Sequence, residues 1–422
     1  MYSLLIFDLT INNKNNKNNK IIESEELTIF SPFKSNPQFR LGYHHFIDRT
    51  RDALGITKKL DTKNDFYFVV NEFEIIIPDY SEHISNLTKI YLNNKDLEFG
   101  NDFYKFWEIL FVFNIIDKNT KTISTISNDA SDCIDCITYF SEKILGVESS
   151  QFEINNINIT QEKEFEYNKE IKNQYLNKIS KKENFSSPSK FIKSKKYSDL
   201  IIANSENYYS SINNKEHESY KLFLGELLVI LSSLNKNGNC VFKFFDTFTM
   251  VTLKIIFLLS NLFEEVYINK PLLSRLSDSE KYLICKKYKY DTNDKQINKI
   301  IKMLEEIISK VDSNNFLNDI FVDYILPDEF INNFKFINIR LVNEQQILIN
   351  EIVKYIKDNN YFGDKFHDSK NKQIEATKWW VSLFFPPSNN IYQTNKEVVQ
   401  KMLKNTVDKN NSEKDKFLSN FI

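Results

Sequence analysis

Apolar segments in the middle of the chain alternate between the length of a strand and the length of a helix. Ser198–Ala203 is a short apolar run, as expected for a buried strand. Glu218–Leu234 has the length of a helix and stops near Asn237 and Gly238, which signal a helix end. Asn239–Phe245 is again short and apolar. This order predicts an α/β fold.

The alternation continues after these segments. A second helix is predicted from apolar residues at positions i, i+4, i+7, i+8 and i+11, which share one helix face. These residues are Val251, Ile255, Leu258, Leu259 and Leu262. Val266–Ile268 and Tyr282–Cys285 are predicted to be two more strands. The pattern predicts a largely parallel sheet with helices on both faces and right-handed crossovers.

The length of 422 residues suits two to three domains. We expect an N-terminal accessory α+β region at 1–100, the α/β core at 101–290, and a mostly helical region with a polar tail at 291–422. Asn12–Lys20, Gln161–Lys196 and Thr406–Lys416 are polar, low-complexity stretches that we expect to be solvated. The Lys-rich part at 179–196 is alternatively a basic arm that contacts a phosphate backbone.

Charge and composition restrict the possible partners and compartments. The 55 basic residues nearly balance the 57 acidic ones, so any nucleic-acid contact must come from a local basic patch. Four cysteines exclude a disulfide scaffold. The best apolar run, Ile255–Leu259, is too short for a membrane span, and the N-terminus lacks the features of a signal peptide. We expect a protein with no membrane contact in a reducing, cytoplasmic compartment.

Lys243 is the residue that carries most chemical information. It interrupts the otherwise apolar strand Asn239–Phe245. A lysine in a buried strand is costly unless it is paired with an acid or its pKa is lowered. Taken alone, Lys243 is more simply explained as a strand lysine that extends to the sheet edge.

Two sequence strings around Lys243 resemble a known family. The first is NGNCVFKFF at 237–245, and the second is NKPLLSRLSDSEKYLIC at 269–285. Together with the helix between them, they are similar to the FtsJ-like ribose 2′-O-methyltransferases, nearest to the mRNA cap branch that includes members from large DNA viruses. The match runs almost continuously from Gly225 to Tyr288. The resemblance implies a Rossmann-like fold that uses S-adenosylmethionine (SAM) to methylate RNA, here capped mRNA, without a metal.

The resemblance also implies a Lys-Asp-Lys-Glu catalytic tetrad. The second lysine matches Lys243, which contacts the ribose 2′-OH and assists its deprotonation. To accept a proton, the amine must be uncharged in part of the molecules, which requires a lowered pKa. Glu280 matches the tetrad glutamate, and Lys105, within NDFYKFWEIL at 101–110, matches the first lysine. Where the family has aspartate at the end of a strand, this chain has Asn204, whose amide brings no charge. If the rest of the site is competent, we expect Asn204→Asp to raise activity.

The SAM loop departs from the family pattern as well. The family has a glycine-rich loop after its first strand, whereas Ile126–Ile134 stands there without glycine. The whole chain has only 7 glycines. Glycines let a backbone approach a cofactor closely. The residues placed there are Asn128, Ala130, Ser131 and Asp132. We expect the side chains of Ser131 and Asp132 to enter the cofactor space, with Asp132 repelling the methionine carboxylate.

Other candidate residues leave two explanations open. Lys270 and Arg275 either contact RNA phosphates or cap loop carbonyls. Cys133 and Cys136 have the spacing of a redox or zinc motif, but without a second such pair or a nearby histidine they favour a helix face.

Two aromatic pairs are also more simply structural. His44-His45 is predicted to be a structural or partner-contacting patch, because a metal site needs more ligands nearby. Trp379-Trp380 lies beside Phe384-Phe385 and favours a core cluster over a base-stacking platform.

Two functional hypotheses follow. In the first, the chain is an RNA 2′-O-methyltransferase that uses SAM. In the second, it is a pseudoenzyme: an RNA-binding or scaffold subunit with a protein partner, which kept the core and lost the SAM loop and the tetrad aspartate. In either case we expect a viral protein that acts inside the cell, in the cytoplasm, a virus factory or a virion.

Overall fold

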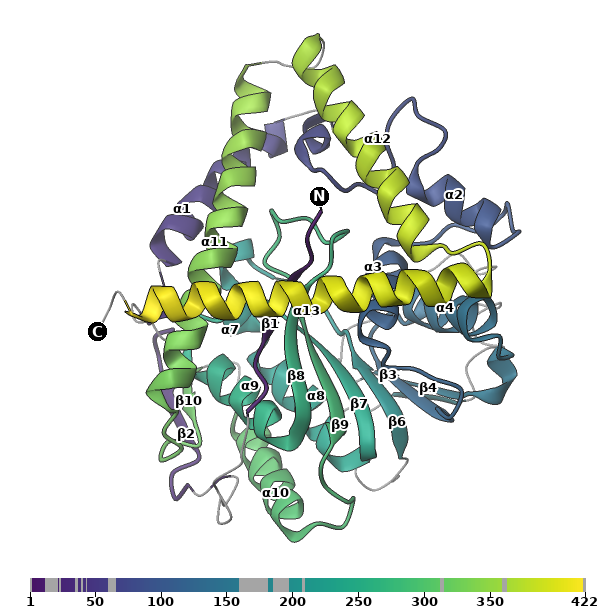
Figure 1. The fold of residues 1–422 in the computed structure, drawn as a ribbon. Helices are drawn as coiled ribbons and strands as arrows, with labels where there is room; N and C mark the ends of the chain where they lie inside the picture. Colours follow the sequence, from purple (N-terminus) through teal and green to yellow (C-terminus); the bar gives the residue numbers. More distant parts are fainter. Residues whose placement is uncertain are drawn as a thin grey trace.

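The computed structural model describes residues 2–11, 22, 24–34, 37–38, 41–42, 44–59, 66–158, 181–184, 197–206, 209–311, 315–358 and 363–419 (Figure 1). The predicted loop at 12–20 and most of the Lys-rich stretch at 161–196 lie outside these residues.

Within the described residues, a mixed eight-stranded sheet forms the centre of the molecule, in the order β1-β8-β9-β7-β6-β3-β4-β5. Strands β3 to β7 run parallel to one another, whereas β9 is antiparallel to both β7 and β8, and β1 is antiparallel to β8. The strands are β1 Leu5–Asp8, β3 Thr122–Ile126, β4 Glu153–Asn158, β5 Lys181–Asn184, β6 Ser198–Ala203, β7 Leu234–Phe244, β8 Phe263–Lys270 and β9 Lys281–Tyr288.

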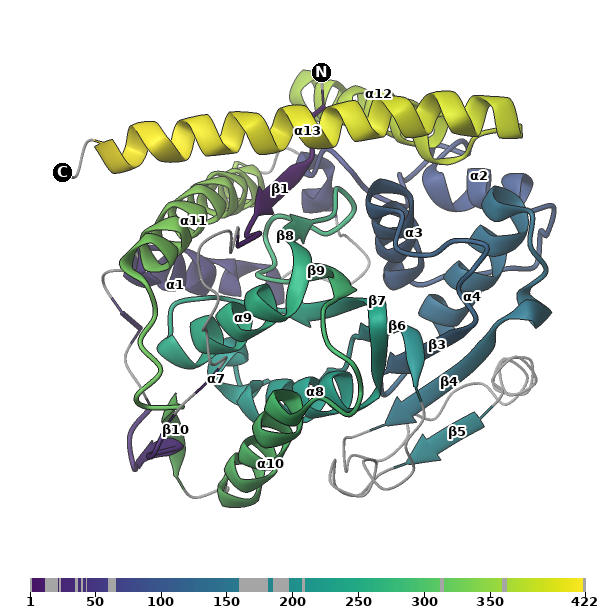
Figure 2. The ribbon, with the colours of Figure 1, turned by 60° about the horizontal axis from the view of Figure 1, so that its bottom comes forward.

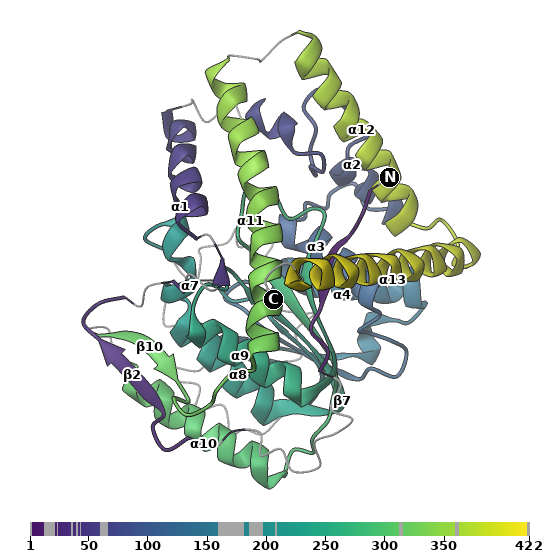
Figure 3. The same ribbon diagram turned by 60° about the vertical axis from the view of Figure 1, so that its left-hand side comes forward.

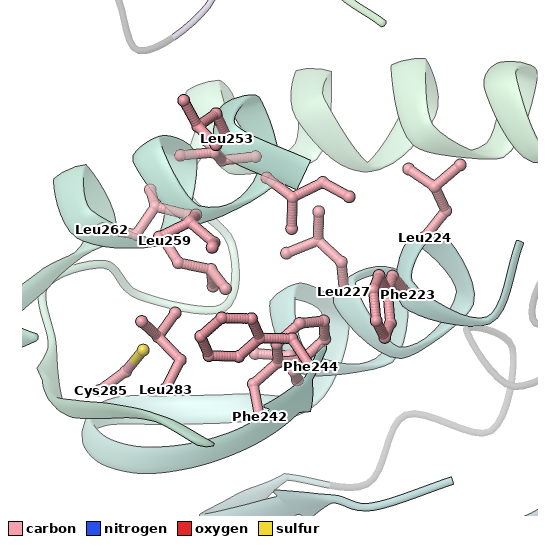
Figure 4. Close-up of a cluster of buried hydrophobic side chains, with 14 of the residues drawn as sticks. Phe223, Leu224, Leu227, Phe242, Phe244, Leu253, Leu259, Leu262, Leu283 and Cys285 are labelled. Carbon is pink, nitrogen blue, oxygen red and sulfur yellow. The ribbon is translucent and has the colours of Figure 1, made fainter. Parts of the chain in front are cut away.

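Helices cover both faces of this sheet, as the sequence pattern predicted (Figure 2). One face carries α8 Tyr220–Ser233, α9 Met250–Leu262 and α10 Lys295–Lys310, and the other carries α3 Asn101–Phe113 and α4 Ser131–Phe140. Successive strand residues point to opposite faces. Phe242 and Phe244 therefore pack against α8 and α9 (Figure 4), while Val241 packs on the α3 side.

The N-terminal residues contribute to two sheets. Strand β1 is an edge strand of the central sheet, and β2 Thr28–Ser31 pairs with β10 Phe316–Ile320 in a separate two-stranded sheet. The further short elements are α1 His44–Ala53, η2 Leu54–Lys59, η3 Phe66–Val70, α2 Ile84–Tyr91, η4 Ser141–Leu145, η5 Ser149–Gln151, η7 Ile212–Asn214 and α7 Lys215–Glu218. The domain boundaries at 100 and 290 stay predictions.

The C-terminal region is mostly helical and returns to the core (Figure 3). Its long helices are α11 Asp328–Lys357, α12 Asp364–Phe384 and α13 Asn389–Ser419. The polar segment Thr406–Lys416 belongs to α13, and apart from Asn410 its residues are exposed or half-buried. Buried Asn410 donates from Nδ2 to the carbonyl of Ile6 at 2.7 Å, so a largely polar helix is held against β1 by specific contacts.

Candidate active site

The site lies at one edge of the sheet, where β6 and β7 end and β9 begins. Three residues pack in the apolar layer under α3: Ile202, Val241 and Tyr282. Asn204 and Lys243 lie two positions after the first two of these residues, and Glu280 lies two before the third. The strand alternation directs all three side chains to the α3 face. The β7–β9 pairing sets Lys243 opposite Tyr282, which brings Glu280 close to the end of β7.

Lys105 reaches the same place from α3. Its Nζ lies 2.9 Å from Oε1 of Glu280 and 3.1 Å from Oε2. The Nζ of Lys243 lies 3.5 Å from Oε2 of the same carboxylate. All three residues are buried. The structure thus brings together the two lysines and the acid that the resemblance assigned, with Glu280 between the two ammonium groups.

Asn204 joins the cluster through a residue that the sequence analysis did not identify. Its Nδ2 donates to Oδ2 of Asp102 at 2.8 Å, and Oδ1 of Asp102 accepts from Nζ of Lys105 at 2.9 Å. Asp102 precedes Lys105 by three residues on α3, a spacing that sets two side chains on one helix face. That spacing was a usable signal, since an acid one turn before a lysine on the same helix is positioned to pair with it.

The acids around Lys243 determine its charge. Burial lowers the pKa of Lys243, but Glu280, Asp102 and Glu206 together raise it above its ordinary value. The pKa of Lys105 is likewise raised, since Glu280 and Asp102 outweigh the effect of burial. The condition expected from the sequence, an amine held near neutrality, is therefore not met: in this structure Lys243 is a protonated ammonium.

Glu206 approaches Lys243 from the solvent side. Its carboxylate forms a hydrogen-bonded ion pair with Nζ of Lys243. The Glu206 side chain is 62% exposed, whereas that of Lys243 is 2% exposed. Glu206 follows the end of β6, in the segment that also contains Asn204. An exposed acid thus covers the buried lysine.

Two further buried acids hold the loops around the site. Glu226 of α8 accepts from the backbone N–H of Ser205 at 3.0 Å, and burial raises the pKa of Glu226 to about 8. Glu108 of α3 accepts from the backbone N–H of Leu272 at 2.9 Å, and burial raises its pKa to about 7. These contacts fix the residues after β6 and after β8, respectively.

The predicted cofactor loop connects β3 to α4, with Ala130 as the residue before the helix. The Asp132 carboxylate accepts from the backbone N–H of Gly100 at 2.8 Å, just before α3. Burial raises the pKa of Asp132 to about 6. A β-carbon on Gly100 would lie 2.2 Å from Oδ2 of Asp132. Asp132 therefore joins α4 to the beginning of α3.

The loop retains polar atoms that a cofactor could use. Ser131 donates its backbone N–H to Oδ1 of Asp129 at 2.9 Å, and Asn128 donates from Nδ2 to the carbonyl of Glu206 at 2.8 Å. Oδ1 of Asn128 and Oδ1 of Asn204 are among the buried side-chain atoms of the described residues that have no hydrogen-bond partner, and both lie at this end of the sheet. Buried polar atoms normally have partners, so these two acceptors fit a ligand that carries donors or positive charge.

The predicted RNA-contacting residues have protein partners. Lys270 is buried and donates from Nζ to the carbonyls of Asp278 and Glu280, at 2.9 and 2.8 Å. Of the two roles predicted for Lys270, contact with RNA phosphates or capping of loop carbonyls, this geometry supports the second. Arg275 pairs with Glu74 at 2.9 Å and stacks over the ring of Phe68, with its side chain 36% exposed.

The remaining sequence candidates lie in packed positions. Cys133 and Cys136 are buried on α4, and Trp380 is buried in the core layer under α3. His44 is buried at the start of α1. In the part of the chain that the structure describes, no group of three metal-ligating side chains comes together, and no helix has the length and hydropathy to cross a bilayer.

Comparison with known proteins agrees with this geometry. The sequence model of the FtsJ-like methyltransferase family matches residues 103–288. The chain is 29% identical over 176 residues to the cap-specific mRNA (nucleoside-2′-O-)-methyltransferase 1 of Caenorhabditis elegans, a match that covers 40% of this chain and 18% of that protein. It is 26% identical over 172 residues to the inactive cap-specific mRNA (nucleoside-2′-O-)-methyltransferase 1B of Caenorhabditis briggsae, with 40% and 20% coverage.

A viral relative matches over a greater length. The uncharacterized protein R383 of Acanthamoeba polyphaga mimivirus is 24% identical over 336 residues, which cover 79% of both chains. By contrast, this chain spans about a fifth of the length of the two nematode proteins. The family match covers strands β3 to β9, α3 from Phe103 onward, and the cluster residues Lys105, Lys243 and Glu280. Residues 103–288 of this chain form an FtsJ-like methyltransferase domain.

Proposed function

We propose that this chain is an RNA ribose 2′-O-methyltransferase that uses SAM and acts on capped mRNA. The observation that carries the proposal is the buried cluster of Lys105, Lys243 and Glu280 at the carboxyl edge of the sheet. The matched domain and the names of the nematode relatives support the substrate class. The mimivirus relative supports a viral protein, for which we infer a cytoplasmic location.

Lys243 would act on the ribose 2′-oxygen. As an ammonium it donates a hydrogen bond to that oxygen and stabilises negative charge that develops there. To accept the 2′-OH proton, Lys243 must first lose its own. Displacement of Glu206 by the ribose removes one of the three carboxylates that raise the pKa of Lys243, which moves the amine toward neutrality. Glu280 keeps Lys243 and Lys105 in place throughout.

The cofactor would bind beside this cluster. When bound, SAM supplies a methyl group on a positively charged sulfonium. The acceptor atoms without partners on Asn128 and Asn204 suit its positive and hydrogen-bond-donating groups. Asp132 does not repel the cofactor, because its carboxylate accepts a hydrogen bond from the backbone N–H of Gly100 at the beginning of α3. The residues present therefore fit the cofactor, although the loop has no glycine.

Calorimetric titration with SAM, combined with methyl incorporation into capped RNA, tests the proposal. We expect saturable heat and a rise in melting temperature, methylation of capped RNA, and loss of methylation but not of SAM binding in Lys243→Ala. The absence of heat and of a thermal shift at millimolar SAM would contradict the enzyme and favour the second hypothesis, a non-catalytic RNA-binding subunit. Asp291→Asn, at an exposed pair with Lys236, serves as the control.

A further inference from the structure

We propose that Asp102 supplies the carboxylate that the tetrad lacks at Asn204, so that the negative charge has moved from the end of β6 to the first turn of α3. This inference rests on the proposed function and deepens it. Asp102 is a positioning residue, because it acts through Lys105 and Asn204. Its role is to orient the lysines and to restore the charge balance of the site.

Both oxygens of Asp102 are used inside the cluster. Oδ1 accepts from Nζ of Lys105 at 2.9 Å, and Oδ2 accepts from Nδ2 of Asn204 at 2.8 Å. Asn204 in turn donates its backbone N–H to the carbonyl of Ile126 at 2.9 Å, which ties it to the end of β3. Asp102 thus connects the lysine of α3 to the position where the family carries its aspartate.

The charge count supports the same conclusion. Apart from the exposed Glu206, the cluster holds two ammonium groups, on Lys105 and Lys243, and two carboxylates, on Asp102 and Glu280. Lys-Asp-Lys-Glu has the same composition. Burial raises the pKa of Asp102, but Lys105 and Lys243 outweigh it and lower that pKa below its ordinary value. Asp102 is therefore an anion that both lysines stabilise electrostatically.

A purely structural role for Asp102 is the alternative, because acids in the first turn stabilise a helix. The structure gives that task to another residue. The Asp132 carboxylate accepts from the backbone N–H of Gly100 just before α3 and also bonds the backbone of Phe103. Both oxygens of Asp102 are instead directed at side chains of the cluster.

The pairing also explains why an amide stands at position 204. A carboxylate needs a donor opposite it, and Asn204 provides one through Nδ2. In Asn204→Asp, two carboxylates would face each other at hydrogen-bond distance without a donor between them. The expectation from the sequence, that Asn204→Asp raises activity, is therefore reversed by this geometry: the single replacement should lower it.

An exchange of the two residues tests the proposal. Asp102→Asn leaves Glu280 to balance both lysines from within the protein, and we expect kcat to fall about 10- to 100-fold. Asn204→Asp should also lower kcat. The double variant Asp102→Asn/Asn204→Asp keeps the hydrogen bond between the two side chains, with donor and acceptor exchanged. It also restores the net charge of the cluster. We therefore expect its kcat to lie within about threefold of that of the parent chain. The Kd for SAM and the melting temperature are measured for each variant.

The results separate failure of this inference from failure of the proposed function. If the parent chain methylates RNA and the double variant is no more active than Asp102→Asn, the role of Asp102 is overturned. If the parent chain does not methylate RNA, the proposed function fails. A double-mutant cycle on the free energy of unfolding then tests the role of Asp102 independently of activity. Recovery of stability in the double variant supports an interchangeable carboxylate; additive losses contradict it. Asp291→Asn is the matched control and should change neither quantity.

Discussion

The carboxylate of Glu206 pairs with the ammonium of Lys243, although the Glu206 side chain is mostly exposed and that of Lys243 is buried. Glu280 and Asp102 hold Lys243 from within the protein, whereas Glu206 approaches it from solvent. An exposed acid is the partner that an entering ribose can replace at the lowest desolvation cost.

Glu206→Gln should therefore make Lys243 easier to deprotonate. Burial lowers the pKa of Lys243 and the three acids raise it, so removal of one acid lowers the pKa. We expect the rising limb of the pH profile of methyl transfer to move to lower pH, with up to about a fivefold higher rate at neutral pH. Glu264→Gln, at an exposed pair with Lys287, is the control. An unchanged profile in Glu206→Gln would exclude this role.

Lys105→Met should destabilise the protein more than loss of a surface lysine does. The substitution leaves the buried Glu280 and the half-buried Asp102 with one cation fewer, and a buried charge without its partner costs roughly 3–5 kcal/mol. Lys236→Met, which breaks an exposed pair, should cost less than about 1 kcal/mol. Urea unfolding measures both. Equal losses in the two variants would show that the buried pairing adds nothing to stability.

Much of the core was predictable because apolar periodicity depends only on local sequence. The segments that became β6, α8 and α9 were predicted close to their observed limits. The direction of β9 was not, because an apolar strand has the same pattern whether its neighbours are parallel or antiparallel. The pairing of β1 with β8 joins residues some 260 positions apart, which no local signal reports.

The site residues were predictable where they belong to specific sequence motifs. Their protonation and their hydrogen-bond partners were less predictable, because these depend on contacts between distant residues. Lys105, Lys243 and Glu280 were assigned from sequence, but the protonation of Lys243 depends on how many acids surround it. Asp102 lies three residues before Lys105, but its contact with Asn204, 102 residues away, is visible only in the fold. Likewise, Asp132 was expected to face the cofactor, and only the packing of α4 against α3 shows that its carboxylate binds Gly100.

Glu108→Gln should remove one source of pH dependence from stability. Burial raises the pKa of Glu108 from its ordinary 4.5 to about 7, so the folded state favours the protonated carboxyl. Its contribution is complete below about pH 4.5 and is lost as pH rises through about 7. We expect roughly 1–3 kcal/mol of this loss to disappear in Glu108→Gln. Unfolding free energies at pH 5 and pH 8 provide the test; the exposed Glu98→Gln should keep the parental slope.

Gly100→Ala should disturb the connection between α3 and α4. A β-carbon at this position would lie 2.2 Å from Oδ2 of Asp132, so the carboxylate that accepts the Gly100 N–H must move. We expect a loss of about 0.5–2 kcal/mol in the free energy of unfolding, as when a side-chain hydrogen bond at the N-terminus of a helix is lost. Gly55→Ala is the matched control, because a β-carbon there meets no atom within 4 Å. Since Asp132 lies at the start of α4, Gly100→Ala should also weaken SAM binding, whereas Gly55→Ala should leave it unchanged. A destabilised Gly100→Ala variant with parental SAM affinity would show that the Asp132 contact supports the fold alone.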